Sequence, residues 1–184
     1  MRLFTGIDLP AEVKINLAAV VDRLRPTARL RWSTVDQLHV TTKFVGEWPE
    51  NRLAELTGIL RGLPGRPPIP ISIGGLGWFP NARAPRVFWA GVEAPAALAE
   101  LARQTDAALA ALGIVPEKRS YSPHLTLARI NDHAPLDGLR RALSTLPAAE
   151  FGAFTAERFY LYLSQRGPSG SVYTKLEEYP FTES

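Results

Sequence analysis

The chain has 184 residues, 46% of them hydrophobic, and its 21 Lys and Arg against 18 Asp and Glu give a net charge of +3. This composition is typical of a globular protein that buries a core, either as one compact domain or as two fused lobes. The absence of cysteine excludes disulfides, thiolate metal sites and a cysteine nucleophile.

The charge balance and the absence of long apolar runs limit the partners and the location. Arginine outnumbers lysine 17 to 4, which suits a polyanionic partner such as RNA, although the modest excess of charge does not identify one. No run of apolar residues is long enough to span a membrane, and the first ten residues lack an export signal. We therefore expect a cytoplasmic protein that does not bind membranes.

Four stretches that begin at a proline carry apolar residues at steps of three and four. Proline suits the first turn of a helix because its missing N–H has no intrahelical partner there. The spacing predicts helices over residues 10–24, 49–63, 95–112 and 135–146.

Runs with strand character lie between these helices, at residues 3–8, 29–32, 38–45, 69–73, 86–93, 122–130, 154–163 and 172–177. A similar order of elements returns from residue 86 onward. We predict an α+β fold over residues 1–184, a single domain with two pseudo-symmetric lobes, each a small antiparallel sheet with helices on its outer face. The Pro-rich residues 64–70 and Gly-rich residues 74–77 are expected to form a linker or flap.

Two of these strands repeat a His-x-Thr pattern, His39 with Thr41 and His124 with Thr126. Residues two apart in a strand share a face, so each motif presents an imidazole beside a hydroxyl. Around the first motif the alternation predicts that Lys43 also faces the groove and that Leu38, Val40, Thr42 and Phe44 face the core. If the two halves are related by a two-fold axis, both motifs line one central cleft.

Paired imidazoles suit cleavage of a phosphodiester, because one can accept a proton from the attacking oxygen while the other donates one to the leaving oxygen. Hydroxyl groups can then stabilise charge on the phosphoryl oxygens. This chemistry needs no metal and no cofactor. A zinc site is disfavoured because threonine is a poor ligand and no further ligand cluster accompanies these histidines. His133 lacks the threonine and is predicted to lie in a solvated turn.

The flanks of both motifs resemble a known family, the 2H phosphoesterases, and within it the RNA 2′,3′-cyclic phosphodiesterases also called 2′-5′ RNA ligases. The similarity spans nearly the whole chain and includes RLFTGIDLP, RWSTVDQLHVTTKFVGEW, GLGWFPNARAPRVFWAGV, SYSPHLTLAR and LYLSQRGPSGSVYTKLEEYPF. It implies a two-lobed α+β fold with both motifs in a basic cleft. The implied activity is metal-independent opening of a terminal 2′,3′-cyclic phosphate of RNA, tRNA fragments included, to a 2′-phosphate.

The same resemblance assigns roles to individual residues. His39 is similar to the general acid that protonates the 3′ oxygen, and His124 to the base that activates water. Thr41, Thr126 and Arg129 match residues that contact the phosphate. Weak reverse 2′-5′ ligation is expected by microscopic reversibility, and the chain is expected to act as a monomer.

Arg129 is three and five residues from Thr126 and His124, so it has the wrong parity to share their face of a regular strand. It can reach the phosphate only through a bulge, a strand end or its long side chain. Two alternative functions stay open: a 2H enzyme for small cyclic nucleotides or 2′-5′ oligoadenylate, and a non-catalytic RNA-binding module that uses the same cleft.

Overall fold

The computed structural model describes residues 1–183 and contains the four predicted helices. They are α1 (Ala11–Leu24), α2 (Leu53–Arg61), α3 (Ala96–Ala110) and α4 (Asp137–Ser144). The strands are β1 (Arg2–Asp8), β2 (Arg31–Trp32), β3 (His39–Glu47), β4 (Ile69–Phe79), β5 (Val87–Glu93), β6 (His124–Arg129), β7 (Glu150–Ala156), β8 (Arg158–Gly167) and β9 (Gly170–Pro180). No helix among these is long and apolar enough to cross a membrane.

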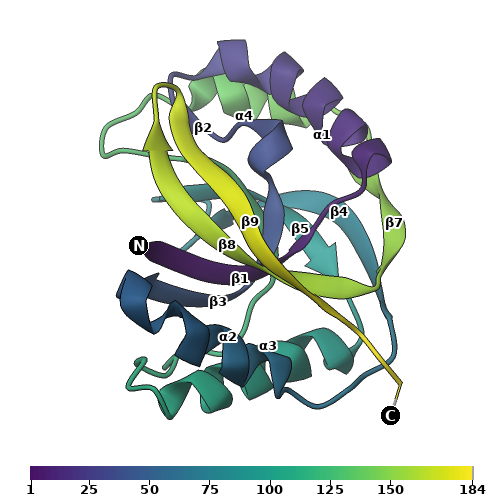
Figure 1. The fold of residues 1–184 in the computed structure, drawn as a ribbon. Coiled ribbons are helices and arrows are strands. Elements are labelled where there is room, and N and C mark those ends of the chain that lie inside the picture. The colour runs from purple at the N-terminus through teal and green to yellow at the C-terminus, as the bar shows by residue number, and fades with distance from the viewer. Residues whose placement is uncertain (184) are drawn as a thin grey trace.

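The strands form two antiparallel sheets, one of four strands in the order β3-β1-β8-β9 and one of five in the order β2-β6-β5-β4-β7. Helices α1 and α4 lie together at one end of the molecule, and α2 and α3 lie together at the other (Figure 1). Helix α1 packs on β7 of the larger sheet, and α3 packs on β3 of the smaller one. The predicted α+β architecture is confirmed.

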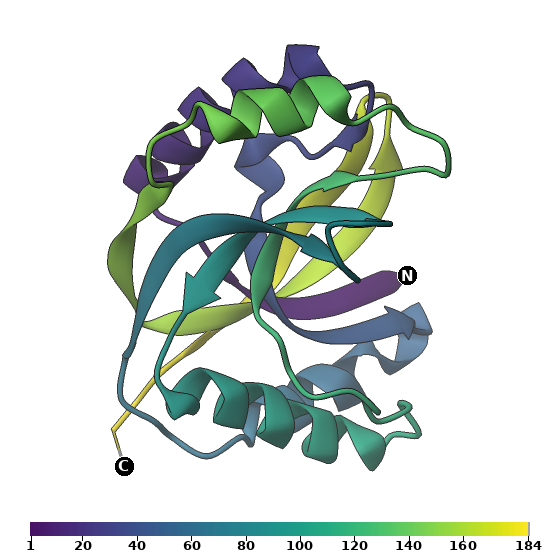
Figure 2. The same cartoon turned by 180° about the vertical axis from the view of Figure 1, so that it is seen from behind.

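The two lobes are not the two successive halves of the chain. Strand β4 pairs with β5, and β8 pairs with β1, so each half supplies a strand to the other sheet. The single strand predicted at residues 154–163 is two strands, because the chain passes from one sheet to the other at Glu157. Figure 2 shows these crossings from behind. Continuous apolar alternation does not reveal such a crossing, since both strands have a buried face.

The Gly-rich residues 74–77 lie inside β4, so the expectation of a linker or flap there is wrong. Glycine in this part of β4 leaves room for a side chain of the neighbouring strand β5. A Cβ atom on Gly77 would lie 2.2 Å from the ring of Trp89 on β5. A side chain cannot fit there without displacing that ring.

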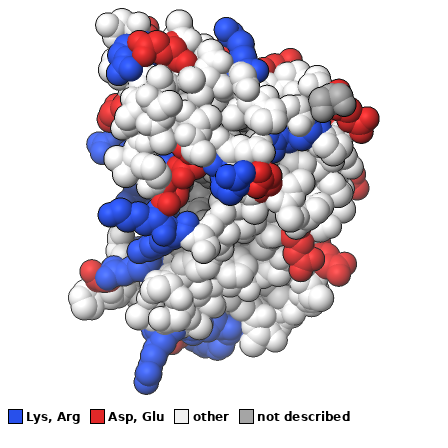
Figure 3. Space-filling model, turned by 90° about the horizontal axis from the view of Figure 1, so that it is seen from below, with Lys and Arg blue, Asp and Glu red and all other residues white. Residues whose placement is uncertain are grey.

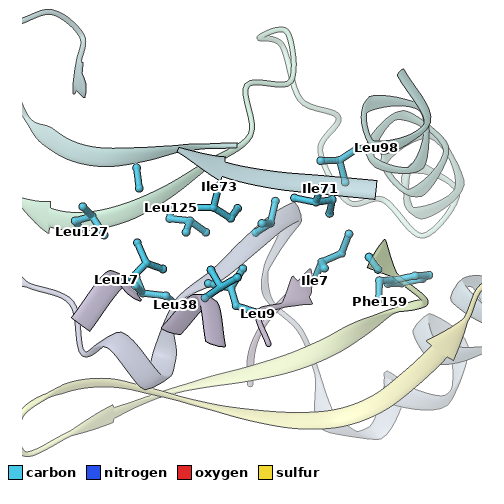
Figure 4. Close-up of a cluster of buried hydrophobic side chains, with 14 of the residues drawn as sticks. Ile7, Leu9, Leu17, Leu38, Ile71, Ile73, Leu98, Leu125, Leu127 and Phe159 are labelled. Atoms are coloured by element: carbon cyan, nitrogen blue, oxygen red, sulfur yellow. The ribbon is translucent and has the colours of Figure 1, made fainter. Parts of the chain in front are cut away.

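One cluster of buried side chains joins the two sheets. In Figure 4, Ile7 and Leu17 lie opposite Ile71 and Leu125, which come from the larger sheet. All four are at most 1% exposed. Burial of this shared surface holds the two sheets in a fixed relation, which the site between them requires.

A buried lysine links β3 to α3 and to the segment that follows this helix. Lys43 is 2% exposed, and its Nζ lies 2.7 Å from Asp106 Oδ1 and 3.6 Å from Glu117 Oε1. The ammonium group also donates a hydrogen bond of 2.9 Å to the Val115 carbonyl. A buried charge is tolerated only when it is paired and hydrogen-bonded in this way.

We expect Lys43→Met to lower the free energy of unfolding by about 2 kcal/mol, because the Asp106 carboxylate loses its cation while part of it stays out of water. Urea denaturation measures this value. The matched control is Lys118→Met, which removes an exposed lysine of the same segment and should change stability by less than about 0.5 kcal/mol. Equal stability of the two variants would show that apolar packing replaces the ion pair without loss.

Candidate active site

Both His-x-Thr motifs line one cleft between the two sheets. His39 and Thr41 of β3 and His124 and Thr126 of β6 are all on its wall. Strands β3 and β6 contact each other there, although 85 residues separate the two histidines in sequence. The cleft has a volume of about 2490 Å³.

Each imidazole is held in the same way by the chain that precedes it. His39 Nδ1–H donates to the carbonyl of Gln37 (2.9 Å), and His124 Nδ1–H donates to the carbonyl of Ser122 (2.8 Å). A carbonyl only accepts, so Nδ1 of each ring carries a proton. Whenever the ring is neutral, its free electron pair is therefore on Nε2.

His39 stands in an aromatic niche. Its ring stacks on Phe4 with centroids 4.4 Å apart and meets the edge of Tyr173 at 4.9 Å. Its Nε2 accepts a hydrogen bond of 3.0 Å from the Thr41 hydroxyl. Burial lowers the pKa of His39 to about 4, although the Gln37 carbonyl and the carboxylate of Asp8 act in the opposite direction. The ring is therefore neutral near pH 7.

Asp8, which lies opposite His39 in the β1–β3 register, keeps its negative charge. Burial raises its pKa, but hydrogen bonds and ion pairs with Lys175 and Lys14 outweigh burial and hold the pKa below its ordinary value. This carboxylate is fixed on the same stretch of sheet as the imidazole, where it favours a positive ring once a proton is available.

His124 is less enclosed. Its ring meets the edge of Phe79 with centroids 5.0 Å apart, and Phe79 in turn lies against Trp89 of β5. Trp89 is directly opposite Thr126 in the β5–β6 register. Each histidine thus has an aromatic ring against it, Phe4 of the adjacent strand β1 for His39 and Phe79 at the end of β4 for His124, and these contacts restrict the plane of the imidazole.

A β-bulge changes the predicted faces of β3. Thr42 has no partner in the register with β1, so Thr42 and Lys43 together oppose Thr5 and both are buried on the side away from His39. The Thr42 and Thr5 hydroxyls share a hydrogen bond of 2.7 Å. Phe44 emerges into the cleft, 56% exposed. The prediction that Phe44 faces the core is wrong, because the bulge reverses the alternation. Lys43 is part of the cleft lining, but it does not share the face of His39, because its ammonium group is held by Asp106 and the Val115 carbonyl.

The same irregularity recurs in β6. Leu127 has no partner in the register with β5, so Leu127 and Ala128 oppose Phe88, and both are at most 1% exposed. Beyond this bulge Arg129 lies on the cleft wall with His124 and Thr126. The bulge that the parity of Arg129 required is therefore present. Phe44 and Arg129 occupy equivalent places, five residues after each histidine.

Tyr121 is a site residue that the sequence pattern did not single out. Its hydroxyl donates a hydrogen bond of 2.7 Å to the Thr41 carbonyl, which couples the segment before His124 to the first motif strand. Burial raises the pKa of Tyr121, so the hydroxyl stays protonated and can donate. A lone Tyr in a loop carries no periodic signal, and only the contact across the cleft reveals this role.

The wall of the cleft carries many arginines that have no carboxylate partner among residues 1–183. Those lining it are Arg2, Arg25, Arg29, Arg31, Arg119, Arg129 and Arg166. The acidic residues on the same wall already hold cations: Glu47 pairs with the N-terminal amine, and Asp106 and Glu117 pair with Lys43. Figure 3 shows Lys and Arg side chains gathered beside a hollow. Such a surface attracts phosphate groups.

Three further observations concern grouped metal ligands, His133 and Trp32. Over residues 1–183, no three His, Asp or Glu side chains are grouped so that they could hold a metal ion. His133 lies in an exposed turn, as predicted, and is absent from the cleft wall. Trp32 packs edge-on against Phe88 and donates to the Ala28 carbonyl (3.1 Å), so its ring supports the sheet.

A two-sheet α+β protein with one His-x-Thr strand from each sheet in a shared basic cleft is suited to phosphoester chemistry that proceeds by proton transfer. Comparisons with known proteins agree with this class. The sequence model of the 2′-5′ RNA ligase superfamily matches residues 13–168. The chain belongs to this superfamily.

Similar proteins have been named and solved. The chain is 34% identical to an RNA 2′,3′-cyclic phosphodiesterase of Methanothermobacter thermautotrophicus, over 96% of this chain and 97% of that protein. It is 32% identical to the crystal structure of TT0787 of Thermus thermophilus, with a TM-score of 0.80 and 98% of each chain covered. E. coli LigT complexed with 3′-AMP superposes with a TM-score of 0.81 at 27% identity, over 99% of this chain and 98% of that one.

Proposed function

We propose that this protein is an RNA 2′,3′-cyclic phosphodiesterase that opens a terminal cyclic phosphate to a 2′-phosphate. One observation carries the proposal: two imidazoles, each with Nδ1–H held by a carbonyl two residues earlier, share one cleft rich in unpaired arginine. The names of the relatives support RNA as the substrate. The unpaired arginines along the cleft offer more phosphate contacts than a small cyclic nucleotide can use, which favours an RNA end.

The proposed reaction is a proton transfer through each Nε2. Water attacks phosphorus while Nε2 of His124 accepts its proton, the bond from phosphorus to O3′ breaks, and Nε2–H of His39 donates a proton to O3′. Thr41, Thr126 and Arg129 stabilise the charge on the phosphoryl oxygens. The phosphate stays on O2′, and the product carries a 3′ hydroxyl.

His39 is neutral in the free protein, so the proton that it donates must be taken up when the substrate binds. An anionic phosphate beside Nε2 favours the imidazolium form, and it competes with the hydrogen bond from Thr41. The His39 acid and His124 base assignment rests on the family resemblance.

The proposed function is tested with purified protein, EDTA and an RNA that ends in a 2′,3′-cyclic phosphate. We expect opening at an undiminished rate with the chelator present, and a product whose phosphate resists a 3′-phosphatase, because two imidazoles supply the proton transfers. A control RNA that ends in a 3′-phosphate should be unchanged. Loss of activity with EDTA, or a 3′-phosphate product, contradicts the proposal.

A non-catalytic RNA-binding module is the competing interpretation, since arginines and hydroxyls alone can hold phosphate. Binding does not require two imidazoles that are both held through Nδ1 so that Nε2 is on the side of proton transfer, and that feature favours the enzyme. RNA bound by the wild-type protein without any turnover would support the binding module instead.

A further inference from the structure

Two arginines face each other across the strands at the edge of the cleft. Arg31 of β2 is directly opposite Arg129 of β6, and both side chains are exposed. Neither has a carboxylate within ion-pair distance in the part of the chain that the structure describes. Like charges directly opposite in a sheet are destabilising. An anion bound beside these two guanidinium groups would turn this repulsion into attraction.

The short strand β2 is held so that Arg31 must point to the cleft. Trp32, the next residue, is anchored on the other face by Phe88 and the Ala28 carbonyl. Ser33 then binds β6 twice, from its N–H to the Leu127 carbonyl (2.8 Å) and from its hydroxyl to the Thr126 carbonyl (2.7 Å). This anchoring fixes the backbone of Arg31 beside Arg129 before any ligand binds, which lowers the entropic cost of holding an anion.

The two arginines suit two successive phosphates better than one. Arg129 shares its wall with His124 and Thr126, where the reacting phosphate would lie. Arg31 is one strand further out, about 5 Å away at Cβ by the geometry of cross-strand neighbours. Arg29, two residues earlier in a turn closed by the hydrogen bond from Leu30 N–H to the Ala28 carbonyl, is also exposed on the cleft wall and adds a second cation beside Arg31.

We infer that Arg31, supported by Arg29, binds the internucleotide phosphate that precedes the terminal nucleotide of an RNA chain. This inference deepens the proposed function and rests on it. The subsite makes the protein select an RNA end over a free cyclic nucleotide, because only a polymer carries a second phosphate at that place. Arginine suits this role, since its planar fork binds two phosphate oxygens at once.

The test compares three substrates: a dinucleotide that ends in a 2′,3′-cyclic phosphate, the same dinucleotide with a neutral methylphosphonate linkage, and the cyclic mononucleotide. The variants are Arg31→Gln and, as a matched control, Arg23→Gln, which removes an exposed arginine of α1 outside the cleft. We expect Arg31→Gln to raise the KM for the natural dinucleotide about tenfold with little change in kcat. The KM values for the other two substrates should change far less.

A second readout separates phosphate binding from a structural role. For the natural dinucleotide, the slope of log KM against log salt should fall by about 0.7 in Arg31→Gln, as expected when one phosphate contact is lost. In Arg23→Gln the slope should equal that of the wild type. Urea denaturation should show Arg31→Gln to be at least as stable as the wild type, because the like-charge contact with Arg129 is removed.

The outcomes are distinguishable. A KM that rises equally for all three substrates overturns the inference, because Arg31 would then serve the reacting phosphate or the fold. A wild-type protein that acts equally well on the natural and methylphosphonate dinucleotides also overturns it, and leaves the proposed function intact. A wild-type protein that opens none of the three contradicts the proposed function itself.

Discussion

His39→Ala and His124→Ala should each lower kcat on a cyclic-phosphate-ended RNA by a hundredfold to ten-thousandfold, while KM changes by less than about threefold. Each variant loses a proton transfer that is worth this much in the transition state, but the phosphate keeps its arginine and threonine contacts. Initial rates over a range of substrate concentrations measure both parameters. Because the two rings act in one step, the double variant should be little slower than the worse single variant.

His133→Ala is the matched control, since it removes an exposed histidine from a turn outside the cleft, and it should retain full activity. Circular dichroism should show all the variants to be folded. A kcat within tenfold of the wild-type value in either motif variant would contradict the catalytic role assigned to that histidine.

The same variants can order the acid and the base. A substrate with sulfur in place of O3′ releases a thiolate, which needs little protonation because a thiol has a pKa of about 8.5. The deficit of His39→Ala on this substrate should therefore largely disappear, whereas that of His124→Ala should persist. The opposite pattern of rescue would exchange the two roles.

Acid should destabilise this protein through His39. The folded state holds the pKa of His39 at about 4 by burial, below its ordinary value of 6.5, so the unfolded chain binds more protons between these values. Above pH 6.5 the ring is neutral in both the folded and the unfolded state, so it does not lower the free energy of unfolding. As the pH falls toward 4 the unfolded chain takes up a proton that the folded state resists, and the free energy of unfolding decreases. The expected loss is about 3 kcal/mol.

Urea denaturation at pH 7 and at pH 4 measures this loss, with His39→Gln as the comparison. The variant should lose about 3 kcal/mol less than the wild type over this interval, and His133→Gln should behave like the wild type. Because His39 must be protonated to act as the general acid, kcat/KM should fall as the pH rises above about 4. An unchanged pH dependence of stability in His39→Gln would contradict the burial of a neutral ring.

The sequence by itself determined the elements and the chemistry that they carry. Proline-opened amphipathic runs specified four helices, because the missing N–H and the 3.6-residue period are local properties. The pairs His39 with Thr41 and His124 with Thr126 share a face because residues two apart in any strand do. Both pairs line the cleft, as the repeated pattern predicted.

Tertiary pairing decided what lies beyond those motifs. The bulges at Thr42 and Leu127 exist only relative to β1 and β5, so no alternation along β3 or β6 could place Phe44 and Arg129 on the cleft wall. The break at Glu157 likewise depends on which sheet each strand joins.

Long-range contacts also place Arg31 and Tyr121 at the site. Arg31 is positioned by the register of β2 with β6, and Tyr121 by its hydrogen bond to the Thr41 carbonyl. The physical reason is the range of the interactions. Propensity and periodicity act over a few residues, whereas register, bulges and the meeting of like charges are set by strands that are distant in sequence.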